Sequence, residues 1–127
     1  MSKILASIKN LSEAKILIGT DIDIIDLKDP SKGALGRLDK YDIDTIVSYI
    51  NNKKLTSSTI GDLPNDEILI SKNVDEVSNT NVDFIKIGVY EKSYINTLSK
   101  IRSCKMLIAV FFADRFLPTK KDIETLK

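Results

Sequence analysis

The chain of 127 residues is 43% hydrophobic and 29% charged, and its formal net charge is +1. This size suits one domain with its own core, residues 1–127, and the near-neutral charge without a basic block argues against nucleic acid or a membrane surface as a partner. The sequence has no histidine and one cysteine, which excludes histidine-dependent catalysis, the common zinc sites and a disulfide framework. Because no signal-peptide pattern and no stretch of roughly 20 apolar residues is present, we expect a cytoplasmic protein.

The first two predicted strands, Lys3–Ile8 and Ile22–Leu27, enclose a predicted helix. Both strands are rich in Ile and Leu, a composition typical of strands buried on both faces. Asn10 followed by Glu13 resembles a capping box at the start of the helix, and Gly19 marks its expected end.

A second helix and a third strand follow. The helix is predicted from apolar residues at the spacing of one helix face: Ile43, Ile46, Val47 and Ile50. The third strand is Leu55–Ile60, again an apolar-rich segment. Ile68–Ser78 is the weakest predicted helix, because it is polar throughout and its periodicity is poor.

The last third of the chain predicts two more strands, Val82–Val89 and Met106–Phe112. A short helix between them is indicated by Ile95, Leu98, Ile101 and Arg102. The final residues, TKKDIETLK, have the pattern of a helix beginning.

Strands that alternate with helices favour an α/β fold with parallel strands and crossover helices. A (β/α)₈ barrel typically needs about 250 residues. The sequence therefore predicts the first five βα units of such a barrel, a partial TIM barrel that is the N-terminal part of something larger.

Charged side chains interrupt two of the apolar strands. Because strand side chains alternate, Asp26 and Lys28 share one face at the carboxyl end of the second strand, where the active sites of α/β enzymes gather. Lys86 lies inside the fourth strand, on the face opposite Ile85 and Ile87. A buried lysine is costly unless it is paired or neutral.

Two lysines and an aspartate on interior faces form a coherent chemical set. A desolvated lysine beside a second cation loses its proton more readily and can then attack a carbonyl to form a Schiff base. A second lysine can transfer protons, and an aspartate can orient the amine or act as acid or base. The structural alternative is a solvated strand end at Lys28 and a protective charge on an edge strand at Lys86.

Two further aspartates are candidates for substrate contact. Asp62, in the turn GDLPN after the third strand, and Asp114, after the fifth, lie at the same predicted end of the sheet. A turn stabilised by Asp and Pro, and ordinary strand-end solvation, explain them equally well.

Four segments, in this order and at these separations, resemble the (5-formylfuran-3-yl)methyl phosphate synthase family. They are DIIDLKDPSKGALG, SSTIGDLPN, VDFIKIGVY and, more weakly, AVFFAD at Ala109–Asp114. The resemblance spans essentially the whole chain.

The resemblance implies a (β/α)₈ barrel that condenses two molecules of glyceraldehyde 3-phosphate, without metal or organic cofactor, into the furan precursor of methanofuran. It implies that Lys28 is the Schiff-base nucleophile, that Lys86 is the proton acceptor and that Asp26 is the acidic partner beside the nucleophile.

The chain departs from the family in the polar segment ILISKNVDEVSNTN after GDLPN, in Phe111 and Phe112 where the family has glycine and tyrosine, and above all in length. Members are roughly twice as long, and their later strands supply further site residues and phosphate-binding loops that no residue here matches. The sequence thus predicts a chain truncated after the fifth strand. It is a fragment of a longer gene product, or it pairs with a copy of itself or with a separately encoded C-terminal half, or it survives as an inactive scaffold. A class I aldolase-like enzyme acting on another phosphorylated carbonyl is the alternative reaction.

Overall fold

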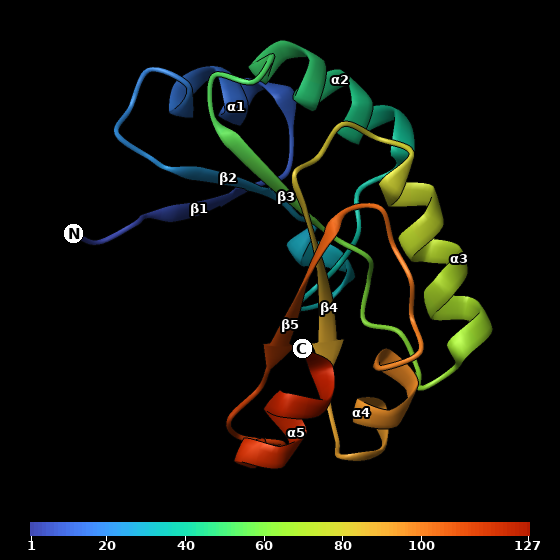
Figure 1. Cartoon of the computed structure of the whole chain (residues 1–127). Coiled ribbons are helices and arrows are strands. Elements are labelled where there is room, and N and C mark those ends of the chain that lie inside the picture. Colours follow the sequence, from blue (N-terminus) through green and yellow to red (C-terminus); the bar gives the residue numbers. More distant parts are fainter.

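The computed structural model describes all 127 residues and shows one parallel sheet of five strands (Figure 1). The strands are β1 (Leu5–Ile8), β2 (Ile24–Leu27), β3 (Leu55–Thr59), β4 (Phe84–Val89) and β5 (Met106–Phe111). They lie in sequence order, and each pairs in parallel with the next. The predicted α/β class with parallel strands and crossover helices is confirmed.

An α-helix follows each strand. The helices are α1 (Leu11–Leu17), α2 (Lys40–Ile50), α3 (Glu67–Ser78), α4 (Ser93–Leu98) and α5 (Lys120–Leu126), and a short 3₁₀ turn, η1 (Pro30–Lys32), follows β2. In Figure 1, α2 and α3 follow one another along one side of the sheet. None of the helices has both the length and the apolar character needed to cross a bilayer.

The core lies between the sheet and its helices. Ile25 and Leu27 of β2 and Ile85 and Ile87 of β4 are buried there, together with the predicted apolar face of α2: Ile43, Ile46, Val47 and Ile50. Because strand side chains alternate, the intervening residues of β2 and β4 face the other side of the sheet. This is the side on which the charged strand residues lie.

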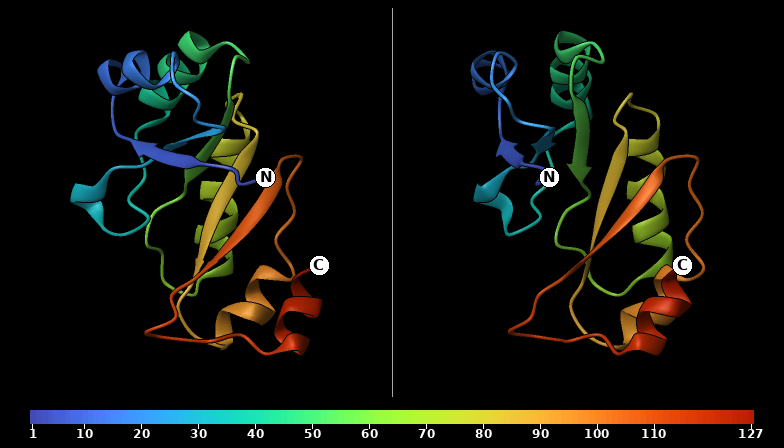
Figure 2. Two further views of the ribbon diagram at one scale, coloured as in Figure 1. Left: turned by 90° about the vertical axis from the view of Figure 1, so that its left-hand side faces the viewer. Right: turned by 60° about the vertical axis from the view of Figure 1, so that its left-hand side comes forward.

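The prediction that every strand is buried on both faces is wrong for β1 and β5. Leu5 and Met106 are exposed, because β1 and β5 form the two edges of the sheet and each pairs on one side only (Figure 2). The strand starts also differ. β2 and β4 begin at Ile24 and Phe84, each directly after an aspartate that accepts a backbone N–H. Asp23 accepts from Ile4, just before β1, and Asp83 accepts from Thr56 in β3.

One helix prediction needs correction, and the weakest one is confirmed. The weakest predicted helix is the twelve-residue α3, which begins where the Asp66 carboxylate accepts the Leu69 N–H at 3.0 Å and buries Ile70, Val74 and Val77. This apolar stripe is narrow, which is why the polar composition concealed it. Helix α4 ends at Leu98, so Ile101 and Arg102 lie outside it. Gly19 directly follows Ile18, the C-cap residue of α1, and so marks the end of that helix as predicted.

Carboxylates that accept hydrogen bonds at strand and helix starts make the stability acid-sensitive. The Ile4 N–H lowers the pKa of Asp23, and the Thr119 N–H lowers the pKa of Asp122. A carboxyl group whose folded pKa lies below its unfolded value adds stability above the unfolded pKa, and this stability is lost as the pH falls through the folded pKa.

We therefore expect the free energy of unfolding to be level above about pH 5 and to fall between about pH 4 and 2. Urea denaturation at a series of pH values measures this, and Asp23→Asn should lose less stability than the parent chain over the same acid range. Equal acid sensitivity of the two proteins would contradict the assignment to Asp23.

Candidate active site at the carboxyl ends of the strands

Asp26 is the centre of a polar row that crosses three strands. It pairs in register with Ser7 of β1 on one side and with Ser57 of β3 on the other, so the three side chains face the same side of the sheet. The Ser7 hydroxyl donates to Asp26 Oδ2 at 3.0 Å, and the Ser57 hydroxyl donates to Oδ1 at 2.6 Å. Asp26 and Ser57 are fully buried.

Lys86 reaches this row from a fourth strand, β4, where it lies two residues beyond Phe84, the register partner of Ser57. Its Nζ donates to Asp26 Oδ2 at 2.9 Å, and its side chain is only 15% exposed. The ion pair offsets the cost of burying either charge. Because β4 lies between β3 and β5, the interpretation of Lys86 as a protective charge on an edge strand is wrong.

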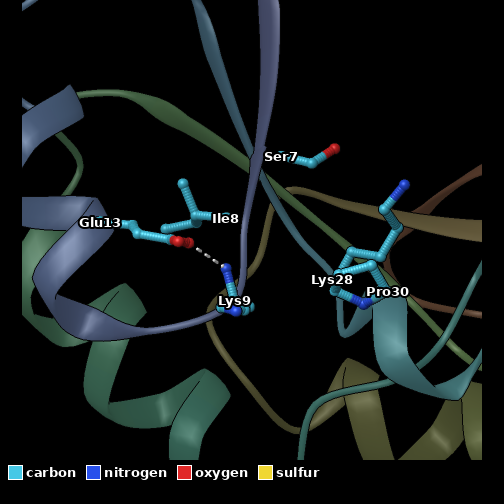
Figure 3. Close-up of a pocket in the computed structure, with 6 residues that line it drawn as sticks. All are labelled: Ser7, Ile8, Lys9, Glu13, Lys28 and Pro30. Atoms are coloured by element: carbon cyan, nitrogen blue, oxygen red, sulfur yellow. Dashed lines mark hydrogen bonds between the residues drawn. The ribbon is translucent and has the colours of Figure 1, made fainter.

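Lys28 follows the last residue of β2 and is half-buried. Its backbone N–H donates to the Ile8 carbonyl at 3.0 Å, which continues the pairing with β1. The side chain borders a hollow of about 190 Å³ lined by Ser7, Ile8, Lys9, Glu13, Lys28 and Pro30. Figure 3 shows the Lys28 amine and the Ser7 hydroxyl projecting to the same side, while Glu13 is turned toward the Lys9 N–H.

The Lys28 amine has no partner, whereas both oxygens of Asp26 accept hydrogen bonds. No hydrogen bond or ion pair holds Lys28 Nζ, and the Asp26 oxygens are occupied by Ser7, Ser57 and Lys86. The acidic partner expected beside the nucleophile is thus bonded to the second lysine instead. A free amine on a side chain that borders a hollow suits attack on a carbonyl substrate.

The two lysines stand in one row of the sheet. Thr59 of β3 pairs with Lys86, and Lys28 comes one residue after the Leu27–Ser58 pair, so Lys28 is level with Thr59. Because β2 and β4 are separated by two strand spacings of about 4.8 Å, the Cα atoms of Lys28 and Lys86 are roughly 10 Å apart. Side chains of lysine length can therefore reach one small molecule from both sides.

Asp62 and Asp114 have different surroundings. Asp62 accepts the Leu35 N–H and the Tyr90 hydroxyl, and it borders a second hollow of about 350 Å³ that Leu63, Pro64, Tyr90, Tyr94 and Arg115 also line. Burial, followed by the hydrogen bond to Asp62, raises the pKa of Tyr90. Asp114 is exposed in the turn after β5 and forms no side-chain hydrogen bond or ion pair.

Ser7, Ser57, Tyr90 and Arg115 were not predicted as site residues. Strand alternation puts Ser7 and Ser57 each on a definite face of its own strand. Only the register between strands shows that both side chains face Asp26. The guanidinium of Arg115 lies 5.1 Å from the centre of the Tyr90 ring, a contact between two loops that no local pattern indicates.

The loop after β2 closes tightly around Gly36. A Cβ at this position would lie 2.0 Å from the Asp29 carbonyl oxygen, and the Gly36 carbonyl accepts both the Asp29 N–H and the Thr59 hydroxyl at 2.8 Å. We expect Gly36→Ala to lower the free energy of unfolding by about 1–3 kcal/mol because the backbone must move. Gly19→Ala is the control, since nothing lies within 4 Å of its Cβ. Equal urea midpoints for the two variants would contradict the expected clash of the added Cβ with the Asp29 carbonyl.

The chain is similar to known proteins over most of its length. Residues 4–126 match the family model described as 4-HFC-P synthase. The (5-formylfuran-3-yl)methyl phosphate synthase of Methanococcus aeolicus is 29% identical over 124 residues, which cover 89% of this chain and 53% of the relative. That of Methanosarcina barkeri is 32% identical over 89 residues, which cover 70% of this chain and 38% of the relative. The chain thus spans about half the length, or less, of these curated relatives.

A solved structure shares the fold. The crystal structure of 2,3-dimethylmalate lyase, a member of the PEP mutase/isocitrate lyase superfamily, superposes with a TM-score of 0.61 at 14% identity. The superposition covers 98% of this chain and 54% of the lyase. At this level of identity the likeness concerns the fold alone.

Proposed function

Because this chain belongs to the 4-HFC-P synthase family, we propose that it forms (5-formylfuran-3-yl)methyl phosphate from two molecules of glyceraldehyde 3-phosphate, as the first part of a (β/α)₈ barrel. The observation that carries the proposal is the unengaged amine of Lys28, which borders a hollow beside the ion pair of Asp26 and Lys86. The likeness to a lyase of which the chain covers 54% supports the barrel.

The chemistry begins at Lys28. Its neutral amine attacks the aldehyde carbon, a C–N bond forms, and the carbonyl oxygen leaves as water with the two protons that the nitrogen gives up, so that a Schiff base remains. Lys86, within reach of the same small molecule, transfers protons during condensation and ring closure, and Asp26 holds it in place. Asp62 and Asp114 contact the substrate from the loops after β3 and β5.

Borohydride trapping tests this proposal. The purified chain is incubated with glyceraldehyde 3-phosphate, reduced, and digested for peptide mass spectrometry. The expected result is a reduced adduct on Lys28 alone, which other sugar phosphates form much more slowly. Equal trapping of unrelated sugar phosphates would favour the class I aldolase-like reaction. Folded protein that forms no adduct would contradict the proposal and favour an inactive scaffold.

We also propose a partner that supplies further strands to the edges β1 and β5, either a second copy or a separately encoded C-terminal half. Support comes from the exposed edge residues Leu5 and Met106 and from the curated relatives, which are about twice as long as the matched region. Light scattering of the purified chain, alone and with a candidate half, distinguishes these two partners.

A further inference from the structure

We propose that Ser7 and Ser57 are positioning residues that clamp the Asp26 carboxylate and thereby fix the Lys86 ammonium in the site. The inference rests on the proposed function in one respect, namely that Lys86 transfers protons. It assigns a role to two serines that the sequence did not single out.

The clamp is visible in the distribution of donors. Asp26 Oδ1 accepts from Ser57 at 2.6 Å, while Oδ2 accepts from Ser7 at 3.0 Å and from Lys86 at 2.9 Å. An aspartate carboxylate can otherwise turn about its terminal torsion, which has a broad energy well. With donors on both oxygens and from strands on both sides, the carboxylate has one orientation in which every donor is satisfied.

Removing one serine hydroxyl leaves the Asp26 carboxylate with one donor fewer and frees it to turn. Without Ser57, Oδ1 of a fully buried carboxylate loses its partner, and an unsatisfied buried acceptor is costly. The carboxylate then turns to share its remaining donors, and the bond to Lys86 lengthens or breaks. Ser7 also borders the hollow that Lys28 lines (Figure 3). It therefore adjoins both the ion pair and the proposed nucleophile.

The chain offers a matched control in Ser58. It is the same residue type, is the next residue in β3, and is as fully buried as Ser57. Its hydroxyl donates to the Thr59 carbonyl at 3.2 Å, and strand alternation turns it away from Asp26. Ser58→Ala therefore removes a buried hydroxyl without touching the clamp.

Competitive labelling of lysines measures how firmly Lys86 is held, independently of any enzymatic activity. Reductive methylation with formaldehyde and cyanoborohydride, followed by peptide mass spectrometry, gives a rate for each lysine. We expect Ser7→Ala and Ser57→Ala to raise the rate at Lys86 roughly 5- to 10-fold, as for one lost hydrogen bond to a charged group. Ser58→Ala should leave the labelling rate at Lys86 unchanged. Ser57→Thr, which keeps a hydroxyl, should label Lys86 as slowly as the parent chain does.

Two labelling results would overturn the clamp. One is an unchanged Lys86 rate in both alanine variants when circular dichroism shows them folded. The other is an equal increase in Ser58→Ala, which would indicate general loosening of the sheet. Because labelling needs no substrate, it judges the clamp even where the parent chain fails to trap glyceraldehyde 3-phosphate, which is a failure of the proposed function alone.

A kinetic readout separates positioning from a purely structural role. In protein that traps substrate, Ser57→Ala should slow adduct formation at Lys28 without changing the substrate concentration at half-maximal rate. A freed Lys86 together with an unchanged trapping rate would overturn the positioning role.

Discussion

Replacing Lys28 with arginine is expected to abolish the borohydride-trapped adduct, lowering its yield more than about 100-fold. Arginine keeps its proton at any ordinary pH, so it has no lone pair with which to attack an aldehyde. Its length and charge resemble those of lysine, so the hollow next to Ser7 should keep its shape. The adduct is quantified by mass spectrometry of the peptide that contains residue 28.

Lys54→Arg is the matched control for this substitution. Lys54 is likewise half-buried, but it precedes β3, at the opposite end of the sheet, and donates to the Thr20 carbonyl at 2.5 Å. The control should trap substrate as the parent chain does. Persistence of the adduct in Lys28→Arg, on another lysine, would show that the nucleophile lies elsewhere.

Replacing Lys86 with methionine is expected to lower the free energy of unfolding by about 3–5 kcal/mol, the usual cost of leaving a buried charge without its partner. Asp26 is fully buried and loses its only ion-pair partner, although its two serine donors remain. Asp26→Asn in the same chain removes the orphaned charge and should recover much of the loss. Urea denaturation at pH 7 measures all three proteins.

An exposed ion pair of the same length provides the comparison. Lys40 Nζ and Asp44 Oδ2 are also 2.9 Å apart, but their side chains are 48% and 43% exposed. Lys40→Met should therefore cost no more than about 1 kcal/mol. If Lys86→Met cost no more than Lys40→Met, the pair would contribute little to the fold, and its place in the site would have to be explained by catalysis alone.

The sequence was informative wherever a local pattern determines the structure. Strand alternation correctly put Lys86 opposite Ile85 and Ile87, and the order of apolar segments predicted the parallel sheet. The helical spacing of α2 identified its buried face without error. These features depend on neighbours within a few residues, which is why they could be predicted.

The partners of Asp26 could not be predicted, because they depend on register. Ser7, Ser57 and Lys86 are separated from Asp26 by 19, 31 and 60 residues, and a shift of one residue in any strand would turn the side chain to the other face. For the same reason, Asp26 was expected beside Lys28, its neighbour along the strand, and was found bonded to a lysine two strands away.

The carboxylate of Asp26 accepts hydrogen bonds or an ion pair from β1, β3 and β4 while belonging to β2. Detaching any one of these strands leaves a buried charge with a donor missing, so partial opening of the sheet is penalised. The four strands should therefore exchange their amide protons as one cooperative unit, while β5, which contributes nothing to Asp26, opens independently and at lower free energy.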